Sequence, residues 1–116
     1  MVNHGVPFQK KQLHTAAGAD ADGLTLNCFT PEGAYVKGAF QIGGTVTTAT
    51  VYFEGTVNGT VWVGIEAKSS VDSATTEVSA TAAGVWFFEC AGLSAVRARL
   101  DWTAGSIDVW GTLIGG

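Results

Sequence analysis

The chain has 116 residues, the size of a single domain, and only 14% of them are charged. Hydrophobic residues make up 47% and mean hydropathy is +0.26, which excludes an intrinsically disordered chain. The net charge of −4 excludes a basic nucleic-acid-binding surface, and no apolar stretch is long enough for a membrane-spanning helix. We therefore expect one folded domain whose partners include neither nucleic acid nor a membrane.

The first 22 residues differ in character from the rest of the chain. They contain Pro7, Lys10 and Lys11, but they show no sustained hydrophobic period and no apolar core of a secretory signal. We expect residues 1–22 to form an extended N-terminal arm and residues 23–116 to form the folded domain. The arm carries apolar side chains that could anchor on a neighbouring subunit and lysines that could face its acidic surface. These candidate assembly contacts are Val6, Phe8, Lys10, Lys11 and Leu13.

From residue 24 onward, short segments rich in β-branched and aromatic residues alternate with turn residues. The strands expected in this half of the chain are residues 24–29, 34–42, 46–54 and 61–68. Gly43-Gly44 is expected to end the second of them. Asn58-Gly59 predicts a type I′ hairpin turn into the fourth, because that turn needs positive φ at both central residues. The side chains expected to share one face of the fourth strand are Val61, Val63, Ile65 and Ala67.

The second half of the chain continues the same pattern. Strands are expected at residues 74–80, 85–90, 96–102 and 106–114, with the first of these a polar edge strand and a turn at 103–105. The alternation at 96–102 places Arg97 and Arg99 outside. The side chains that it turns inward are Val96, Ala98, Leu100 and Trp102. No segment has helical periodicity, so about eight antiparallel strands predict an all-β fold, either a β-sandwich or a jelly roll.

The residues that usually carry chemistry are not grouped in the sequence. His4 and His14 lie in the expected arm, away from any strand-borne nucleophile. Cys28 and Cys90 belong to no C-x-x-C pair, so we expect two buried, unpaired thiols in a reducing compartment. We expect no catalytic residue, no metal and no cofactor, and hence a protein that is not an enzyme.

Four tryptophans are many for this length, and two of them are candidate surface aromatics. Trp62 and Trp110 alternate with the polar sides of their expected strands. They could form a sugar-stacking platform, as in carbohydrate-binding modules. They could instead pack in a core or form a subunit contact, which we favour because aromatic residues are enriched in cores and interfaces.

One ordered set of segments carries a family resemblance. Residues 53–62, FEGTVNGTVW, resemble the signature F-x-G-S-x-D/N-G-x-x-W of small β-sandwich domains in virion proteins of tailed bacteriophages. Residues 84–88, 92–99 and 105–111 resemble the strands that follow in that family, with Trp86 in place of the usual tyrosine. Discoidin-like sugar-binding sandwiches share the first segment.

The resemblance implies a non-enzymatic virion protein, either a head decoration (cement) protein or a tail-associated structural protein. It would be assembled in the host cytoplasm as a homo-oligomer, with a trimer favoured, on the major capsid protein or on tail components. The low charge agrees with this, because sheet edges with few lysines are expected to be covered by neighbours. The alternative is a carbohydrate-binding module, free or on the tail, whose partner is a glycan.

Overall fold

The computed structural model describes residues 8–31 and 33–115, apart from the side chains of residues 46–48 and 73–75. The described chain is all-β, as predicted, and no helix in it could cross a membrane. Its strands are β1 (Phe8–Ala17), β2 (Thr25–Asn27), β3 (Phe29–Thr30), β4 (Gly33–Ala34), β5 (Lys37–Thr56), β6 (Val63–Gly64), β7 (Ala67–Ser69), β8 (Asp72–Glu77), β9 (Ser79–Ala80), β10 (Gly84–Glu89) and β11 (Ala95–Ile114).

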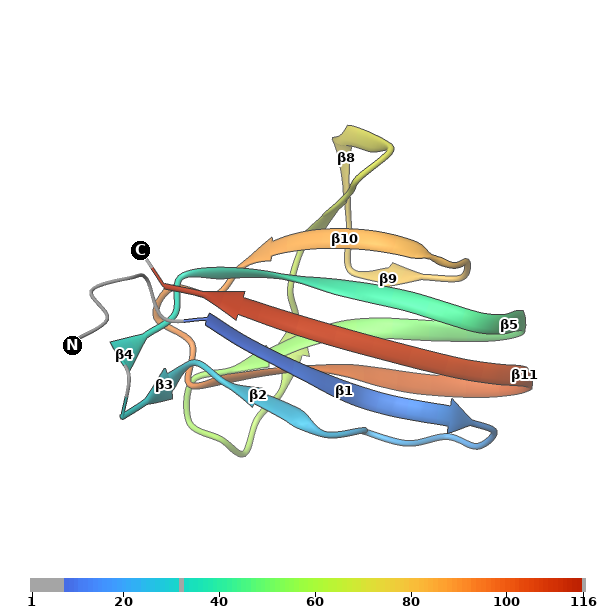
Figure 1. The fold of residues 1–116 in the computed structure, drawn as a ribbon, viewed down its shortest axis with the longest axis horizontal. Helices are drawn as coiled ribbons and strands as arrows, with labels where there is room; N and C mark the ends of the chain where they lie inside the picture. Colours follow the sequence, from blue (N-terminus) through green and yellow to red (C-terminus); the bar gives the residue numbers. More distant parts are fainter. Residues whose placement is uncertain (1–7, 32, 116) are drawn as a thin grey trace, which may run out of the picture.

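Two strands of 20 residues, β5 and β11, run antiparallel and fold back together halfway along their length (Figure 1). Their pairing extends from Lys37–Ile114 to Thr56–Ala95. The front layer contains the first half of β5 and the second half of β11, with β1, β10, β7 and β8 beside them. The back layer contains the other halves, with β2, β6 and β9. The predicted sandwich is therefore one sheet that is doubled over.

The expected breaks at Gly43-Gly44 and at residues 103–105 are bends rather than strand ends. Gly44 and Gly105 have φ of +89° and +106°, a region that glycine enters without strain. The register shifts between Trp102 and Gly105, as at a β-bulge, which sharpens the local twist. Each strand therefore continues through its turn signal and passes from one layer into the other.

The core lies between the two layers and is held by stacked aromatic rings. The Phe40 ring from the front layer lies 5.4 Å from the Phe53 ring of the back layer and 4.5 Å from that of Phe88. The predicted alternation in β11 is confirmed, because Val96, Ala98 and Leu100 are buried while the two arginines between them are partly exposed. Trp102, expected in the core, is half-buried and packs against its margin.

The expectation of an N-terminal arm is wrong for residues 8–17, which form β1. This strand pairs with β11 from Phe8–Ile114 to Ala17–Ile107. Leu13 and His14 are buried, and His14 Nε2 lies 2.6 Å from the carbonyl oxygen of Ala98. Next to the domain boundary expected between residues 22 and 23, Ala21 exchanges two backbone hydrogen bonds with Leu100.

The strand expected at residues 61–68 is broken into β6 and β7. Val61 and Val63 are exposed and Ile65 is half-buried, so only Ala67 of the expected face is buried. Asn58 does form a turn, since its Oδ1 accepts hydrogen bonds from the N–H groups of Thr60 and Val61. However, φ is positive at Gly59 and not at Asn58, which excludes type I′. After this turn only the two residues of β6, Val63 and Gly64, pair with β5, opposite Gly55 and Glu54.

Shortening Leu100 to alanine is expected to lower the free energy of unfolding by about 2–5 kcal/mol, because the side chain is fully buried between the layers. Urea unfolding followed by tryptophan fluorescence measures this loss. A loss below about 0.5 kcal/mol would mean that β11 is one residue out of register, since such a slip exchanges its faces.

Candidate functional site

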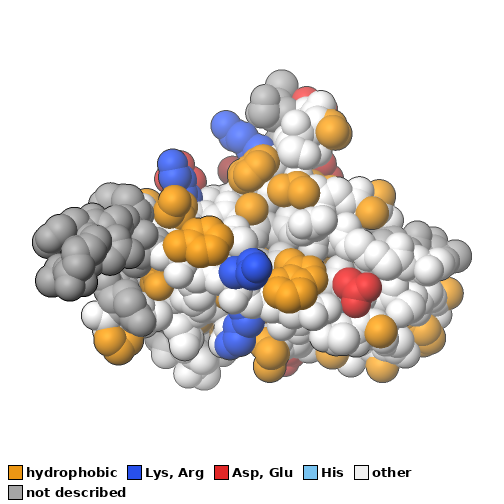
Figure 2. All heavy atoms as spheres, in the orientation of Figure 1, with side chains coloured by type: hydrophobic (Ala, Val, Ile, Leu, Met, Phe, Trp, Pro, Cys, Tyr) orange, Lys and Arg blue, Asp and Glu red, His pale blue; other side chains and the backbone are white. Residues whose placement is uncertain are grey.

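The outer surface of the front layer carries three exposed aromatic side chains, and we call it the aromatic face. The strand register places its side chains in three rows across the sheet. The first row is Phe8, Ile114, Lys37 and Glu89, the second is Lys10, Thr112, Ala39, Phe87 and Lys68, and the third is Gln12, Trp110, Gln41 and Val85. In Figure 2, orange hydrophobic patches alternate with blue Lys or Arg side chains on the visible face.

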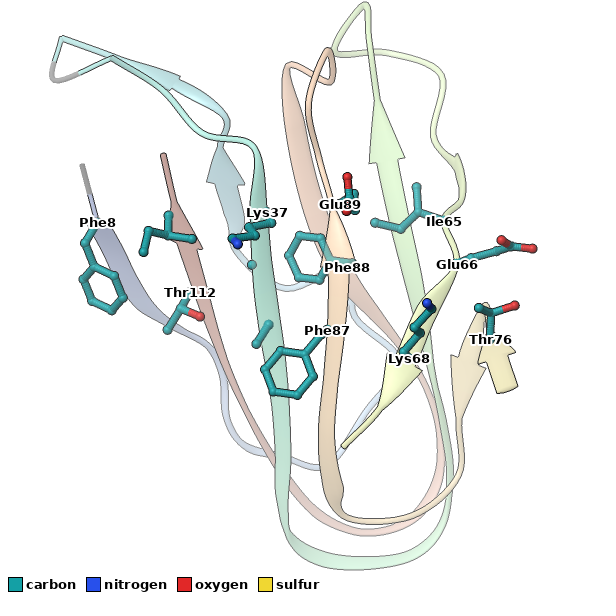
Figure 3. A pocket seen from close by; sticks show the side chains of 13 residues that line it. Phe8, Lys37, Ile65, Glu66, Lys68, Thr76, Phe87, Phe88, Glu89 and Thr112 are labelled. Atoms are coloured by element: carbon teal, nitrogen blue, oxygen red, sulfur yellow. The ribbon is translucent and has the colours of Figure 1, made fainter. Parts of the chain in front are cut away.

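A groove of about 800 Å³ crosses the first two rows of the aromatic face. Phe8 and Phe87 come from strands on opposite sides of Thr112 and are 62% and 53% exposed (Figure 3). Between them, the short side chains of Ala39 and Thr112 leave room above the sheet. The groove thus offers apolar walls to a partner without any change in the core.

A smaller hollow of about 420 Å³ adjoins the groove at Trp110. Trp110 is 40% exposed, and the Lys10 ammonium lies 5.9 Å from its ring centre, within range of a cation–π attraction. Gln41 lies opposite Trp110 on β5, and Thr112 closes the hollow. An aromatic ring, an amide, a hydroxyl and an ammonium therefore meet in one place.

Trp62, the other candidate surface aromatic, lies on the outer surface of the back layer. The guanidinium of Arg97 lies 4.2 Å from its ring centre. The Glu54 carboxylate accepts hydrogen bonds from Nε of Arg97 at 2.9 Å and from Nε of Arg99 at 3.1 Å. Arg99 in turn covers the ring of Tyr52 at 4.4 Å. These contacts tie Trp62 into a cross-strand ion network, so Trp62 and Trp110 do not form one platform.

The expected assembly contacts separate in the structure. Phe8 and Lys10 lie on the aromatic face, whereas Leu13 lies in the core and Lys11 Nζ donates to the Thr25 carbonyl oxygen at 3.1 Å. Val6 lies outside the described residues. Sequence reasoning missed Phe87, which the alternation in β10 turns outward between the buried Trp86 and Phe88.

The expected thiols lie in the core. Cys28 and Cys90 are both buried, and neither forms a disulfide. Within residues 8–31 and 33–115, no group of three or more histidine, cysteine, aspartate or glutamate side chains is placed to hold a metal ion.

Comparison with solved structures identifies the fold. The SPBc2 prophage-derived protein YomS superposes with a TM-score of 0.84 at 18% identity, over 99% of both chains. The PBSX exported protein XepA superposes with a TM-score of 0.87 at 20% identity, over 99% of this chain and 40% of that one. A cyanophage Pam1 capsid asymmetric unit reaches a TM-score of only 0.39 at 21% identity.

No protein-family model matches the chain, and no curated protein sequence matches it. The two high TM-scores concern structures at or below 20% identity, which establishes the fold alone. The chain thus has a β-sandwich fold that occurs in phage-derived proteins.

Proposed function

We propose that this chain is a non-enzymatic structural protein of a phage particle and that its aromatic face binds another virion protein. The observation that carries the proposal is the exposure of Phe8, Phe87 and Trp110 on one side of one layer. The occurrence of this fold in the prophage-derived protein YomS supports it. The preferred role is that of a decoration or cement protein on the capsid surface, acting as an oligomer.

Physical chemistry favours a covered state for this face. Large exposed apolar patches are rare on monomeric proteins, and aromatic residues are enriched where protein partners meet. Covering a phenylalanine side chain completely is worth about 1.5–3 kcal/mol, so two rings and a tryptophan could supply the centre of an interface. Lys10, Lys37 and Lys68 around the rings would add attraction to an acidic partner.

Replacing Phe87 with alanine is expected to weaken particle binding at least about tenfold, because central aromatic contacts cost more than about 1.4 kcal/mol when truncated. Co-sedimentation with purified phage particles, empty heads and isolated tails measures the binding and separates a capsid partner from a tail partner. Light scattering on the protein alone reports its oligomeric state.

Phe29 provides the matched control. It is 60% exposed but belongs to the small β3–β4 sheet, so Phe29→Ala removes the same ring away from the aromatic face. Equal binding by the wild-type and Phe87→Ala proteins, together with folded protein in both cases, would refute a role for the aromatic face.

A second candidate function, glycan binding, is favoured by the hollow at Trp110. Sugar rings stack on exposed aromatic rings, and the Gln41 amide, the Thr112 hydroxyl and the Lys10 ammonium could bond to sugar hydroxyls. Titration with purified host cell-wall polysaccharide, followed by tryptophan fluorescence, tests it. Saturable binding lost in Trp110→Ala but kept in Trp62→Ala would favour this candidate, and no binding would exclude that polysaccharide.

A further inference from the structure

Two thiols from opposite layers lie together in the core. Cys28 follows β2 of the back layer and is 0% exposed, while Cys90 follows β10 of the front layer and is 1% exposed. The Tyr35 N–H donates to the Cys28 carbonyl oxygen, and the Cys90 N–H donates to that of Val36, both at 2.9 Å. Consecutive residues of one segment thus hold both cysteine backbones. The Cys28 thiol donates a hydrogen bond to the sulfur of Cys90.

The pKa values of the two thiols shift in opposite directions. The hydrogen bond from Cys28 lowers the pKa of the Cys90 thiol. The same bond, together with burial, raises the pKa of Cys28. Cys90 also precedes the exposed turn at Ala91-Gly92, whereas Cys28 is followed by the β3–β4 hairpin. Cys90 is therefore the thiol that a small opening of the turn would uncover first.

We propose that Cys28 and Cys90 are a site of reversible oxidation, at which a low-molecular-weight disulfide converts the thiol pair into an intramolecular disulfide between the two layers. Both side chains belong to one buried cluster, and the hydrogen bonds between the two cysteine backbones and the consecutive residues Tyr35 and Val36 hold them beside each other. The bond would be absent in a reducing cytoplasm and would form when the protein meets an oxidising medium.

The reaction proceeds by two exchanges. The Cys90 thiolate attacks one sulfur of the small disulfide, a new S–S bond forms to Cys90, and one small thiolate leaves. That thiolate takes up the proton of the Cys28 thiol, and the Cys28 thiolate attacks the sulfur of Cys90. The mixed disulfide then breaks, and the second small thiolate leaves and is protonated by solvent. The protein loses two electrons and two protons, and the oxidant becomes two free thiols.

The new bond would link the back layer at β2 to the front layer at β10 and would close a loop that runs from β3 through β10. Closing a long loop restricts the unfolded chain, so we expect the melting temperature to rise by about 10 °C or more.

The test uses the full chain, purified under reduction and then incubated with oxidised glutathione. Before oxidation, alkylation in denaturant should label two thiols. After oxidation, it should label neither, the intact mass should fall by two hydrogens, and the melting temperature should rise. Dithiothreitol should reverse all three changes. The double variant C28A/C90A is the control, and its melting temperature should not respond to glutathione.

Single variants test the order of events. With Cys28→Ala, Cys90 remains and should form a mixed disulfide with glutathione. With Cys90→Ala, the remaining Cys28 should do so several-fold more slowly. Two thiols that stay free after prolonged oxidation, or disulfide-linked dimers in place of the intramolecular product, would overturn the proposal. These readouts do not involve the aromatic face, so they are independent of particle binding.

Discussion

Replacing Phe40 with alanine is expected to lower the free energy of unfolding by about 3–5 kcal/mol. Phe40 is completely buried, and its ring stacks on Phe88 within the front layer and on Phe53 from the back layer. The variant would lose contacts in both layers and leave a cavity where they meet. Because domains of this size are stable by only about 5–15 kcal/mol, a large part of the total would be lost.

Urea unfolding followed by tryptophan fluorescence measures the effect of Phe40→Ala. The exposed Phe29 again gives the matched comparison, since Phe29→Ala is expected to change stability by less than about 0.5 kcal/mol. Similar losses in the two variants would contradict the assignment of Phe40 to the centre of the core.

Deleting residues 1–19 is expected to abolish cooperative unfolding and to give aggregated protein. The deletion removes β1, a strand whose residues 8–17 pair with residues 107–114 of β11. It also removes the buried side chains of Leu13 and His14. It would also leave the second half of β11 as a bare sheet edge, which invites pairing with other chains. Thermal unfolding by circular dichroism and size-exclusion chromatography measure the two effects.

Point variants in β1 separate the contribution of its buried side chains from that of its backbone pairing with β11. Leu13→Ala in the full chain is expected to cost about 2–5 kcal/mol, whereas Lys10→Ala, on the exposed side of β1, should cost less than about 0.5 kcal/mol. A truncated protein that unfolds cooperatively at the wild-type temperature would show that β1 is dispensable.

The strands that could be predicted are those whose two faces meet different surroundings. In β11, Val96, Ala98 and Leu100 alternate with two arginines, so one face had to be buried. In β1, this signal fails because Gln9 and Lys11 are partly buried polar residues. Their side chains donate to backbone carbonyl oxygens of β2, which no local pattern reveals.

The turn residues led to wrong strand ends where pairing across the sheet was stronger than the local preference for a turn. Gly43-Gly44 and residues 103–105 carry turn residues, yet each segment bends beside the other and stays paired. In an isolated strand, a pair of glycines would end the strand. When the paired strand bends at the same place, the glycines bend the strand and the pairing continues. The sequence contains both bends, but only the register shows that they are opposite one another.

The sequence predicted individual residues of the candidate site but not that they lie together on one face. Phe8 and Lys10 were identified as candidates in the expected arm and Trp110 in its expected strand, while the alternation in β10 could have indicated Phe87. Their meeting on one face depends on the order β1-β11-β5-β10 across the sheet, in which only sequence-distant strands are neighbours. Local periodicity carries no information about that order.

The place of β11 in the sheet has a consequence for synthesis on the ribosome. β1 and β2 both pair with β11 among the described strands, and β5 pairs with it along its whole length. Since β11 follows all of these strands in the chain, they emerge before their partner exists. The edge of β5 that pairs with β11 must then wait without its partner, although β6, β9 and β10 can already pair with the other edge. Completion of the sheet thus waits for β11 and closes long loops, the kind of step that takes milliseconds to seconds.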